Sequence, residues 1–402
     1  MPPQPARRPQ GSAAEVLRVA LRLGLSSFGG PIAHLGYFER VYVRERAWLS
    51  GEEYASLVAL CQILPGPTSS QVGFLIGLHR AGWRGALAAW AGFTLPSALL
   101  LYGGARLAAH FHGPLAGALV HGLKLAAVAV VAQALWSMAR RLCRDAGTWL
   151  IALGAMALLL ATGDANAQLA VLAAAAAAGL LWCHPTAVPA TGTAVQWRQP
   201  TAALAAFLLL LVTLPPLSWR YPESGVALAQ VVYRAGALVF GGGHVVLPLL
   251  RAALVPAGWL SDDAFLAGYG LAQAVPGPLF TVAAYLGAVA APAAPAGGAA
   301  LALAAIFAPG LLLAPAGSSL WSKLGQQARL GAALTGVNAA VVGVLAAALY
   351  NPVWVNAVHD GVDLAVAAIA LLLLWSGRAP PLAAVLLCTV ASLLRLAFDL
   401  RA

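Results

Sequence analysis

Long apolar runs, nearly free of charged residues, recur along most of the chain and are separated by short polar segments. A helix that spans a bilayer needs about 20 apolar residues, and fewer where its ends are polar or neighbouring helices shield it. The pattern therefore predicts an all-α polytopic membrane protein. The runs are Ala86–Leu101, Leu115–Met138, Leu169–Leu181, Thr201–Leu217, Ala299–Leu313, Ala332–Leu349, Leu364–Trp375 and Leu382–Leu394.

The composition supports a membrane location. Of the 402 residues, 61% are hydrophobic and only 9% are charged, whereas about a quarter of the residues in a soluble domain are charged. We therefore expect a multi-pass protein of the plasma (inner) membrane. Residues 1–12 are polar and rich in proline and arginine. They lack the apolar run of a signal peptide and are predicted to form a disordered cytoplasmic lead.

An internal repeat organises the chain. The motif Phe28-Gly-Gly recurs as Phe240-Gly-Gly, Trp48-Leu-Ser recurs as Trp259-Leu-Ser, and Pro-Gly-Pro follows in both copies at a nearly constant offset. A shared register over successive landmarks indicates duplication. The predicted division is a lead at 1–12, a first repeat at 13–183, a linker with one connecting transmembrane helix at 184–223, and a second repeat at 224–397.

Each repeat is expected to hold two broken, re-entrant helix hairpins, with tips at Phe-Gly-Gly and Pro-Gly-Pro, followed by four longer apolar helices. One extra apolar run, Thr201–Leu217, lies between the copies and would invert the second. The loop Arg40–Glu53 carries three arginines, whereas the equivalent Arg251–Asp263 carries one. Because arginine-rich loops face the cytoplasm, we expect two inverted homologous repeats. A parallel tandem duplication would leave the charge difference unexplained.

The two kinds of tip are the first candidates for a binding site. In hydrocarbon, a helix breaks only where protein or a wet cavity satisfies its backbone groups, and matching breaks in two halves mark transporter binding sites. A helix N-terminus offers free N–H groups and partial positive charge to an anion. Pro31, Pro67 and Pro278 are predicted to open such helices. The alternative is that the glycines merely allow close helix packing.

Basic residues within the apolar runs favour an anion as the substrate. Arg22 and Arg234 each precede a Phe-Gly-Gly tip by six residues, about 9 Å along a helix, and Lys124 lies in Leu115–Met138. All thirteen acidic residues lie in loops or at helix ends. Ionisable residues at membrane depth are usually functional, and guanidinium forks suit a tetrahedral oxyanion. The alternative is that the arginines snorkel to lipid headgroups.

Polar side chains beside the tips complete the predicted site. Gln62 and Gln273 carry amides that can donate to an anion, and Ser69, Ser70 and Gln71 could add further donors. The alternative for the serines is that membrane hydroxyls often bond their own backbone instead. The substrate-binding prediction comprises Arg22, Ser27, Phe28, Gly29, Gly30, Pro31, Gln62, Pro65, Gly66, Pro67, Ser69, Ser70, Lys124, Arg234, Phe240, Gly241, Gly242, Gln273, Pro276, Gly277 and Pro278. His34 and His244 either couple protons or pack beside a turn.

Other functional classes find no support. The sequence shows no Walker loop, nucleophile elbow or His-Glu-x-x-His motif, so we expect no enzyme activity, catalytic residue, metal or cofactor. The four cysteines are scattered and are expected to pack as small apolar residues. The net charge of +10 lies mostly at segment ends, which indicates membrane orientation and not nucleic-acid binding.

Four segments resemble the chromate ion transporter family, in its two-domain form and over essentially the full length: Leu21–Pro31, His34–Phe38, Trp48–Leu49 and Cys61–Gly73. The resemblance implies a secondary transporter that exports chromate across the bacterial inner membrane, is driven by the proton-motive force and gives chromate resistance. Sulfate would act as a structural mimic. The residues themselves indicate only an oxyanion.

The alternatives are a carrier for sulfate or molybdate, or a membrane enzyme or lipid-handling protein, which would need a nucleophile–base pair or metal ligands at depth. The expected partners are chromate or a related oxyanion, membrane lipid and a second copy of the chain, with no nucleic acid. The second repeat has Gly243 in place of Pro31, and Leu279–Thr281 in place of Thr68–Ser70. We therefore expect the first repeat to make more of the anion contact.

Overall fold

The computed structural model describes residues 11–111, 113–162, 167–183, 200–222, 224–240, 243–324, 328–377 and 379–400, with the backbone only at Ile32 and at 318–324. All regular elements within these ranges are helices. Six of the described helices are long and apolar enough to cross a membrane, and several shorter apolar helices accompany them. The predicted all-α polytopic membrane fold is confirmed.

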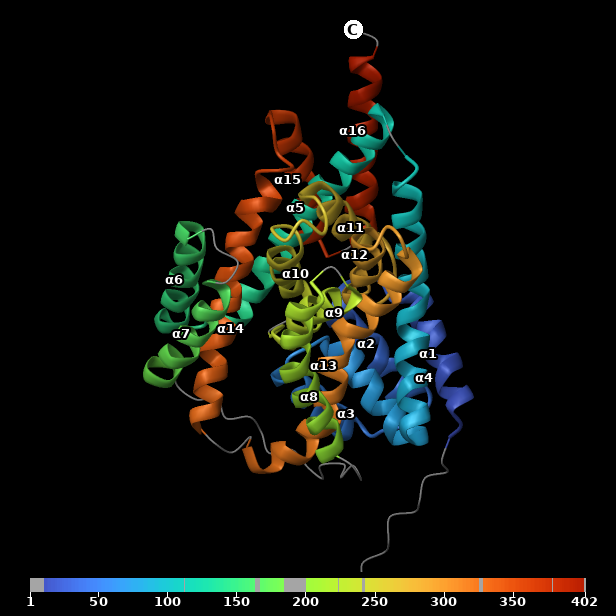
Figure 1. Cartoon of the computed structure of the whole chain (residues 1–402), viewed down its shortest axis with the longest axis vertical. Coiled ribbons are helices and arrows are strands. Elements are labelled where there is room, and N and C mark those ends of the chain that lie inside the picture. The colour runs from blue at the N-terminus through green and yellow to red at the C-terminus, as the bar shows by residue number, and fades with distance from the viewer. Residues whose placement is uncertain are drawn as a thin grey trace, which may run out of the picture.

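The first repeat follows the predicted plan (Figure 1). Helices α1 (Ala13–Ser26) and α2 (Gly30–Phe38) flank the Phe-Gly-Gly tip, and the π-helical η1 (Glu39–Glu45) leads to α3 (Gly51–Ile63), which ends at the Pro-Gly-Pro tip. Helix α4 (Thr68–Ala108) reverses direction at Ala81–Gly82, where the backbone leaves helical geometry. Helices α5 (Pro114–Leu142), α6 (Ala146–Thr162) and α7 (Ala167–Trp182) complete the repeat.

The connecting helix α8 (Pro200–Arg220) precedes the second repeat, whose elements match the first in order. They are α9 (Gly225–Ala237), η2 (Gly243–Val245), α10 (Val246–Leu254), α11 (Asp262–Ala274), η3 (Leu279–Thr281), α12 (Val282–Ala290), α13 (Pro295–Leu324), α14 (Ala328–Ala348), η4 (Leu349–Trp354), α15 (Gly361–Trp375) and α16 (Pro381–Asp399).

The Trp-Leu-Ser landmark has a local structural reason. Ser50 caps α3 by accepting a hydrogen bond from the Glu53 N–H, and Glu53 bonds the Ser50 N–H in return, which makes a capping box. Ser261 caps α11 in the same way, by accepting from the Ala264 N–H. The repeated serine therefore marks the start of the helix that leads into each Pro-Gly-Pro tip.

Equivalent elements run in opposite directions. The end of α4 and the start of α5 lie in the upper part of Figure 1, whereas the end of α13 and the start of α14 lie at its lower edge. The repeats also exchange packing partners: α5 packs against α15 and α16, while α14 packs against α6 and α7. Gly122 in α5 backs onto α16, and its equivalent Gly336 in α14 backs onto α7. The two homologous halves are thus inverted and interlocked.

Candidate functional site

Two reciprocal hydrogen bonds join the tips of one repeat to those of the other. The Gly66 N–H donates to the Val239 carbonyl at 2.8 Å, and the Gly277 N–H donates to the Ser27 carbonyl at 2.9 Å. Each bond connects a Pro-Gly-Pro tip to the residue before the Phe-Gly-Gly tip of the opposite repeat. The two pairs also adjoin each other, because a Cβ added at Gly243 would lie 3.4 Å from Pro31 Cγ and 3.9 Å from Leu279.

The tip glycines are required by backbone geometry. Gly29, Gly30, Gly66 and Gly277 all have positive φ, at 100°, 77°, 119° and 105°, a region that only glycine adopts readily. A Cβ added at Gly66 would lie 2.8 Å from the Cα of Gly310 in α13. The predicted helix breaks are confirmed at these positions, while Gly241 and Gly242 lie outside the described residues.

Helices begin at the tips with their first N–H groups uncapped by side chains. Pro31 lies in the first turn of α2, and Pro67 is the residue before α4. Pro278 holds the same place before η3. None of these three helix starts has a side-chain cap, so their N–H groups and positive dipole ends remain available to an anion. The predicted helix starts at the three prolines are confirmed, and their contact with an anion stays a prediction.

His34 fastens the first Phe-Gly-Gly tip to the start of α4. Its Nε2 lies 3.2 Å from the Ser27 carbonyl and its Nδ1 lies 3.4 Å from the Ser69 hydroxyl. Because a carbonyl only accepts, Nε2 carries the proton and Nδ1 accepts from Ser69. His34 is buried and packs edge-on to Phe93. It therefore belongs to the tip structure.

Several donors at the tips are buried without a hydrogen-bond partner in the described part of the chain. They are Ser27 Oγ, Ser70 Oγ, Thr94 Oγ1 and Gln273 Nε2. Leaving a buried polar group unpaired costs about 1–3 kcal/mol, and such groups in native proteins usually bond ordered water or a ligand. Hydroxyl and amide hydrogens are suitable donors to the oxygens of an oxyanion.

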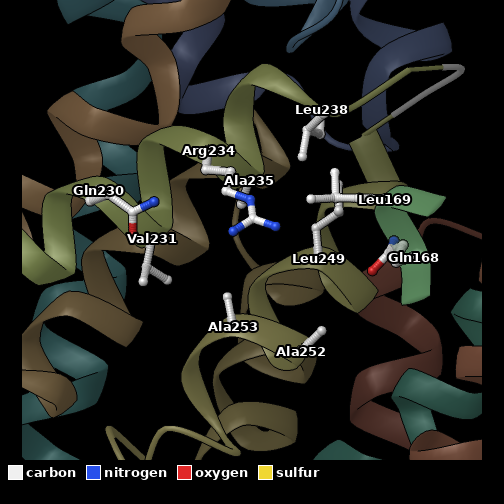
Figure 2. A pocket seen from close by; sticks show the side chains of 10 residues that line it. All are labelled: Gln168, Leu169, Gln230, Val231, Arg234, Ala235, Leu238, Leu249, Ala252 and Ala253. Atoms are coloured by element: carbon white, nitrogen blue, oxygen red, sulfur yellow. The ribbon is translucent and has the colours of Figure 1, made fainter. Parts of the chain in front are cut away.

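Arg234 faces a cavity of about 90 Å³ between α7, α9 and α10. Figure 2 shows its guanidinium pointing into this space, with Leu169 and Leu249 on one side and Gln230 on the other. An adjoining cavity of about 150 Å³ also includes Gln168 and is lined by Arg251. Two arginines thus border neighbouring cavities between the α6–α7–α14 group and α9–α10.

Arg251 is already paired in this arrangement. Its Nε and an Nη donate to the two carboxylate oxygens of Asp262 at 2.6 and 3.0 Å. Such bidentate pairs are geometrically specific and strong. Arg234, in contrast, forms no ion pair among the interactions of the described residues. Its guanidinium is therefore the one of the two that can meet an incoming anion.

Comparison with known proteins covers both repeats. A family model described as "Chromate transporter" matches residues 14–181 and 226–393. The chain belongs to the chromate transporter family. Family members include a chromate transport protein of Pseudomonas aeruginosa, 28% identical over 89% of this chain and 86% of that protein. A probable chromate transport protein of Synechococcus elongatus is 28% identical over 91% of both chains. No solved structure matches this chain.

Membership in the chromate transporter family does not by itself place the site, and the structure separates the two predicted arginines. We expected Arg22 and Arg234 to be buried at equivalent places, but both side chains are exposed. Arg22 lies on the same face of α1 as Leu21 and Leu25, which are also exposed, because the opposite face packs against α4. Of Arg22 and Arg234, only Arg234 lines a cavity.

The predicted glutamines and lysine also differ from one another. Gln273 is buried with its amide nitrogen unpaired, whereas Gln62 is exposed. Lys124 is buried, as expected, but it forms an ion pair with Asp263 of α11. The other predicted residues lie within the four tips or directly beside them in the sequence. They are Ser27, Phe28, Pro65, Pro67, Ser69, Ser70, Phe240, Pro276 and Pro278.

Thr94 at the site was not predicted, and Gln71, expected as a further donor to the anion, uses its amide within the tip structure. Thr94 lies within α4, one residue from the Phe93 carbonyl that an added Cβ at Gly277 would approach to 3.4 Å. Gln71 in the first repeat donates to the carbonyls of Pro65 and Gly310 at 2.9 and 3.1 Å. The position of Thr94 beside Gly277 and the Gln71 bond to Gly310 depend on the opposite repeat, so no local sequence pattern marks them.

Proposed function

We propose that the chain is a secondary transporter that exports chromate across the bacterial inner membrane, is driven by the proton-motive force and thereby gives chromate resistance. Family membership supports chromate as the substrate, since relatives that match most of the chain are named chromate transport proteins. Uncapped helix N-termini beside unpaired buried donors at the crossed tips support the binding of an oxyanion there.

The anion is bound mainly by neutral donors of the first repeat. Ser27, Ser70 and Thr94 contribute hydroxyls from this repeat, and Gln273 contributes an amide from the second. Helix dipoles and neutral donors hold an anion without a salt bridge that would slow its release. Arg234 acts earlier or later on the path, where its cavity attracts the anion toward the tips.

Alternation follows from the inverted repeat. The broken hairpins of one repeat rock against those of the other, so that the tips open first to one side and then to the other. The reciprocal hydrogen bonds of Gly66 and Gly277 are the contacts that such a motion changes. Matching changes in the two repeats then exchange inward-facing and outward-facing states.

The proposal is tested by chromate flux in proteoliposomes that contain the purified full chain. Chromate flux is measured under two pH gradients: one with the acid side where chromate is delivered and one with the acid side where it starts. Only one of the two gradients is expected to accelerate chromate flux. Protein-free liposomes give the background. A tenfold excess of sulfate or molybdate tests the alternative carriers. Flux of sulfate without flux of chromate would replace chromate as the substrate, and absence of flux for all three anions would overturn the proposal.

A further inference from the structure

A cluster of titratable groups connects the two repeats. Its residues are distant in sequence from the tips. Asp363 in α15 is the only carboxylate among the described residues that is buried, with 2% exposure. Its Oδ1 lies 2.8 Å from His121 Nε2, on α5 of the first repeat. Its Oδ2 accepts from the His359 N–H at 3.0 Å and lies 3.6 Å from His359 Nδ1.

Arg395 completes the cluster from α16. It lies 3.3 Å from Asp363 Oδ1 and 2.6 Å from Asp360 Oδ2. Asp399 also acts on it electrostatically. The hydrogen bond from Arg395 lowers the pKa of Asp360 to about 2, so Asp360 stays ionised near neutral pH. We name the group of His121, His359, Asp360, Asp363 and Arg395 the inter-repeat clasp.

The arrangement is suited to binding protons. Imidazole side chains change charge near neutral pH. With neutral imidazoles, the clasp has two carboxylates and one guanidinium and therefore a formal charge of minus one; with both imidazoles protonated, the charge is plus one. The three potential ligand atoms of His121, His359 and Asp363 lie within 4.8 Å of one another. However, the Arg395 guanidinium beside the carboxylate disfavours a divalent cation by charge repulsion.

The clasp brings a buried carboxylate next to solvent-exposed imidazole groups. His359 is largely exposed, Asp363 is buried and His121 is partly buried, so the buried carboxylate lies between an exposed and a partly exposed imidazole. Helices α15 and α16 reach the upper end of the molecule in Figure 1, whereas α3 lies at the lower end, near the arginine-rich η1. The positive-inside rule therefore assigns the clasp to the non-cytoplasmic side.

The clasp is also connected mechanically to a tip. His121 lies one helical turn from Lys124 on α5, and Lys124 pairs with Asp263 at the start of α11. Helix α11 ends directly before the second Pro-Gly-Pro tip. The adjacent Gly122 packs its backbone against α16 at Cys388 and Thr389. A change in the attraction between α5 and α15 is thereby transmitted to a helix that carries part of the anion site.

We propose that the inter-repeat clasp is the proton-binding site that couples proton entry to anion movement, with protons supplied from the non-cytoplasmic side. The neutral His121 ring donates to the Asp363 carboxylate; when the ring gains a proton, this hydrogen bond joins two opposite charges and becomes stronger. Helix α5 is then held more tightly against α15, and the proton is released when the repeats rearrange. This proposal rests on the proposed transport of chromate.

The experiment separates anion exchange from proton-driven transport, using the full chain in proteoliposomes. Exchange of external for internal chromate at equal pH needs the anion site alone, whereas accumulation under a pH gradient also needs coupling. Asp363→Asn and His121→Gln are expected to retain exchange within about threefold and to lose gradient-driven accumulation by at least tenfold. The matched control is His110→Gln, because His110 is exposed and its ring, among the described residues, bonds only the Arg106 carbonyl of its own turn.

The outcomes are distinguishable. If the unaltered chain shows no chromate exchange, the proposed function fails irrespective of the clasp. If it does exchange chromate and Asp363→Asn still accumulates it under the gradient, the clasp proposal is overturned. If Asp363→Asn does not fold, His359→Gln decides, since this exposed side chain can change without loss of the buried pair. The proposal would likewise be overturned if chromate accumulation in both the His359→Gln and the His121→Gln variants depended on pH as it does in the unaltered chain.

Discussion

The substitution Gly277→Ala tests whether the tip of one repeat packs against the other repeat as the structure shows. At its φ of 105°, an alanine costs about 1–2 kcal/mol relative to glycine. The new Cβ would also lie 2.7 Å from Ser97 Oγ and 3.2 Å from Ser97 Cβ. Overpacking of this kind costs about 1–3 kcal/mol. The total expected loss of stability is about 2–5 kcal/mol.

Ser97→Gly is expected to rescue only the overpacking. With the serine side chain removed, the next atom is the Phe93 carbonyl oxygen at 3.4 Å, an ordinary contact. Gly310 occupies the equivalent place opposite Gly66, so a glycine here has a counterpart in the same fold. Ser97→Gly alone should cost about 0.5–1 kcal/mol within a helix, and the double variant should show a favourable coupling of about 1–3 kcal/mol.

The assay is unfolding of the purified chain in mixed micelles by titration with dodecyl sulfate, followed by circular dichroism. Gly30→Ala serves as the control, since it has positive φ but no atom within 4 Å of the added Cβ. It should lose only the conformational part, and Ser97→Gly should not rescue it. A coupling below about 0.5 kcal/mol, or equal rescue of both alanine variants, would refute the cross-repeat packing.

Three further predictions concern topology, the arginines and the unpaired hydroxyls. With the native cysteines replaced, a single cysteine in Arg251–Asp263 should react with an impermeant thiol reagent on intact cells and one in Arg40–Glu53 should not; equal labelling would contradict the inverted orientation. Arg234→Gln should raise the half-saturation for chromate at least tenfold, because a hydrogen bond to a charged group contributes about 1.5–3 kcal/mol. Arg234→Lys should recover little, since lysine lacks the fork. Arg22→Gln should change flux less than twofold, and a larger loss would return Arg22 to the site. Ser70→Ala should keep or slightly raise stability yet raise the half-saturation about 2- to 10-fold; unchanged affinity in concentration-dependent uptake would mean that only water meets this hydroxyl.

Features governed by local chemistry could be predicted from the sequence. The tip breaks follow from glycines that adopt positive φ and from prolines at helix starts, and both motifs recur in the second repeat. The helix that leads to each Pro-Gly-Pro tip begins at a serine cap, as at Ser50 and Ser261. These signals act within a few residues, so a single sequence contains them.

Contacts between distant residues could not be predicted in the same way. Arg22 was expected to be buried, but which face of α1 is covered depends on α4. Lys124 was correctly expected to be buried, yet its partner Asp263 belongs to the other repeat. His121 and Asp363 are 242 positions apart. In the sequence, Asp363 precedes an apolar run and therefore resembles an ordinary acidic residue at a helix start. Packing within the first repeat decides the exposure of Arg22, and interlocking of the repeats decides the other two.

The exchange of packing partners between the repeats has a consequence for biogenesis. Helices α6 and α7 pack mainly against α14, which leaves the ribosome roughly 150 residues after α7 is complete. At about 5–20 residues per second, the two helices wait on the order of 10–30 s in the bilayer before their partner arrives. Gly179, which fits against the backbone of Gly336, is without this partner until then. The N-terminal half is thus inserted well before it is assembled, and a nascent chain stalled in between would present quality-control proteases with an unpaired helical hairpin.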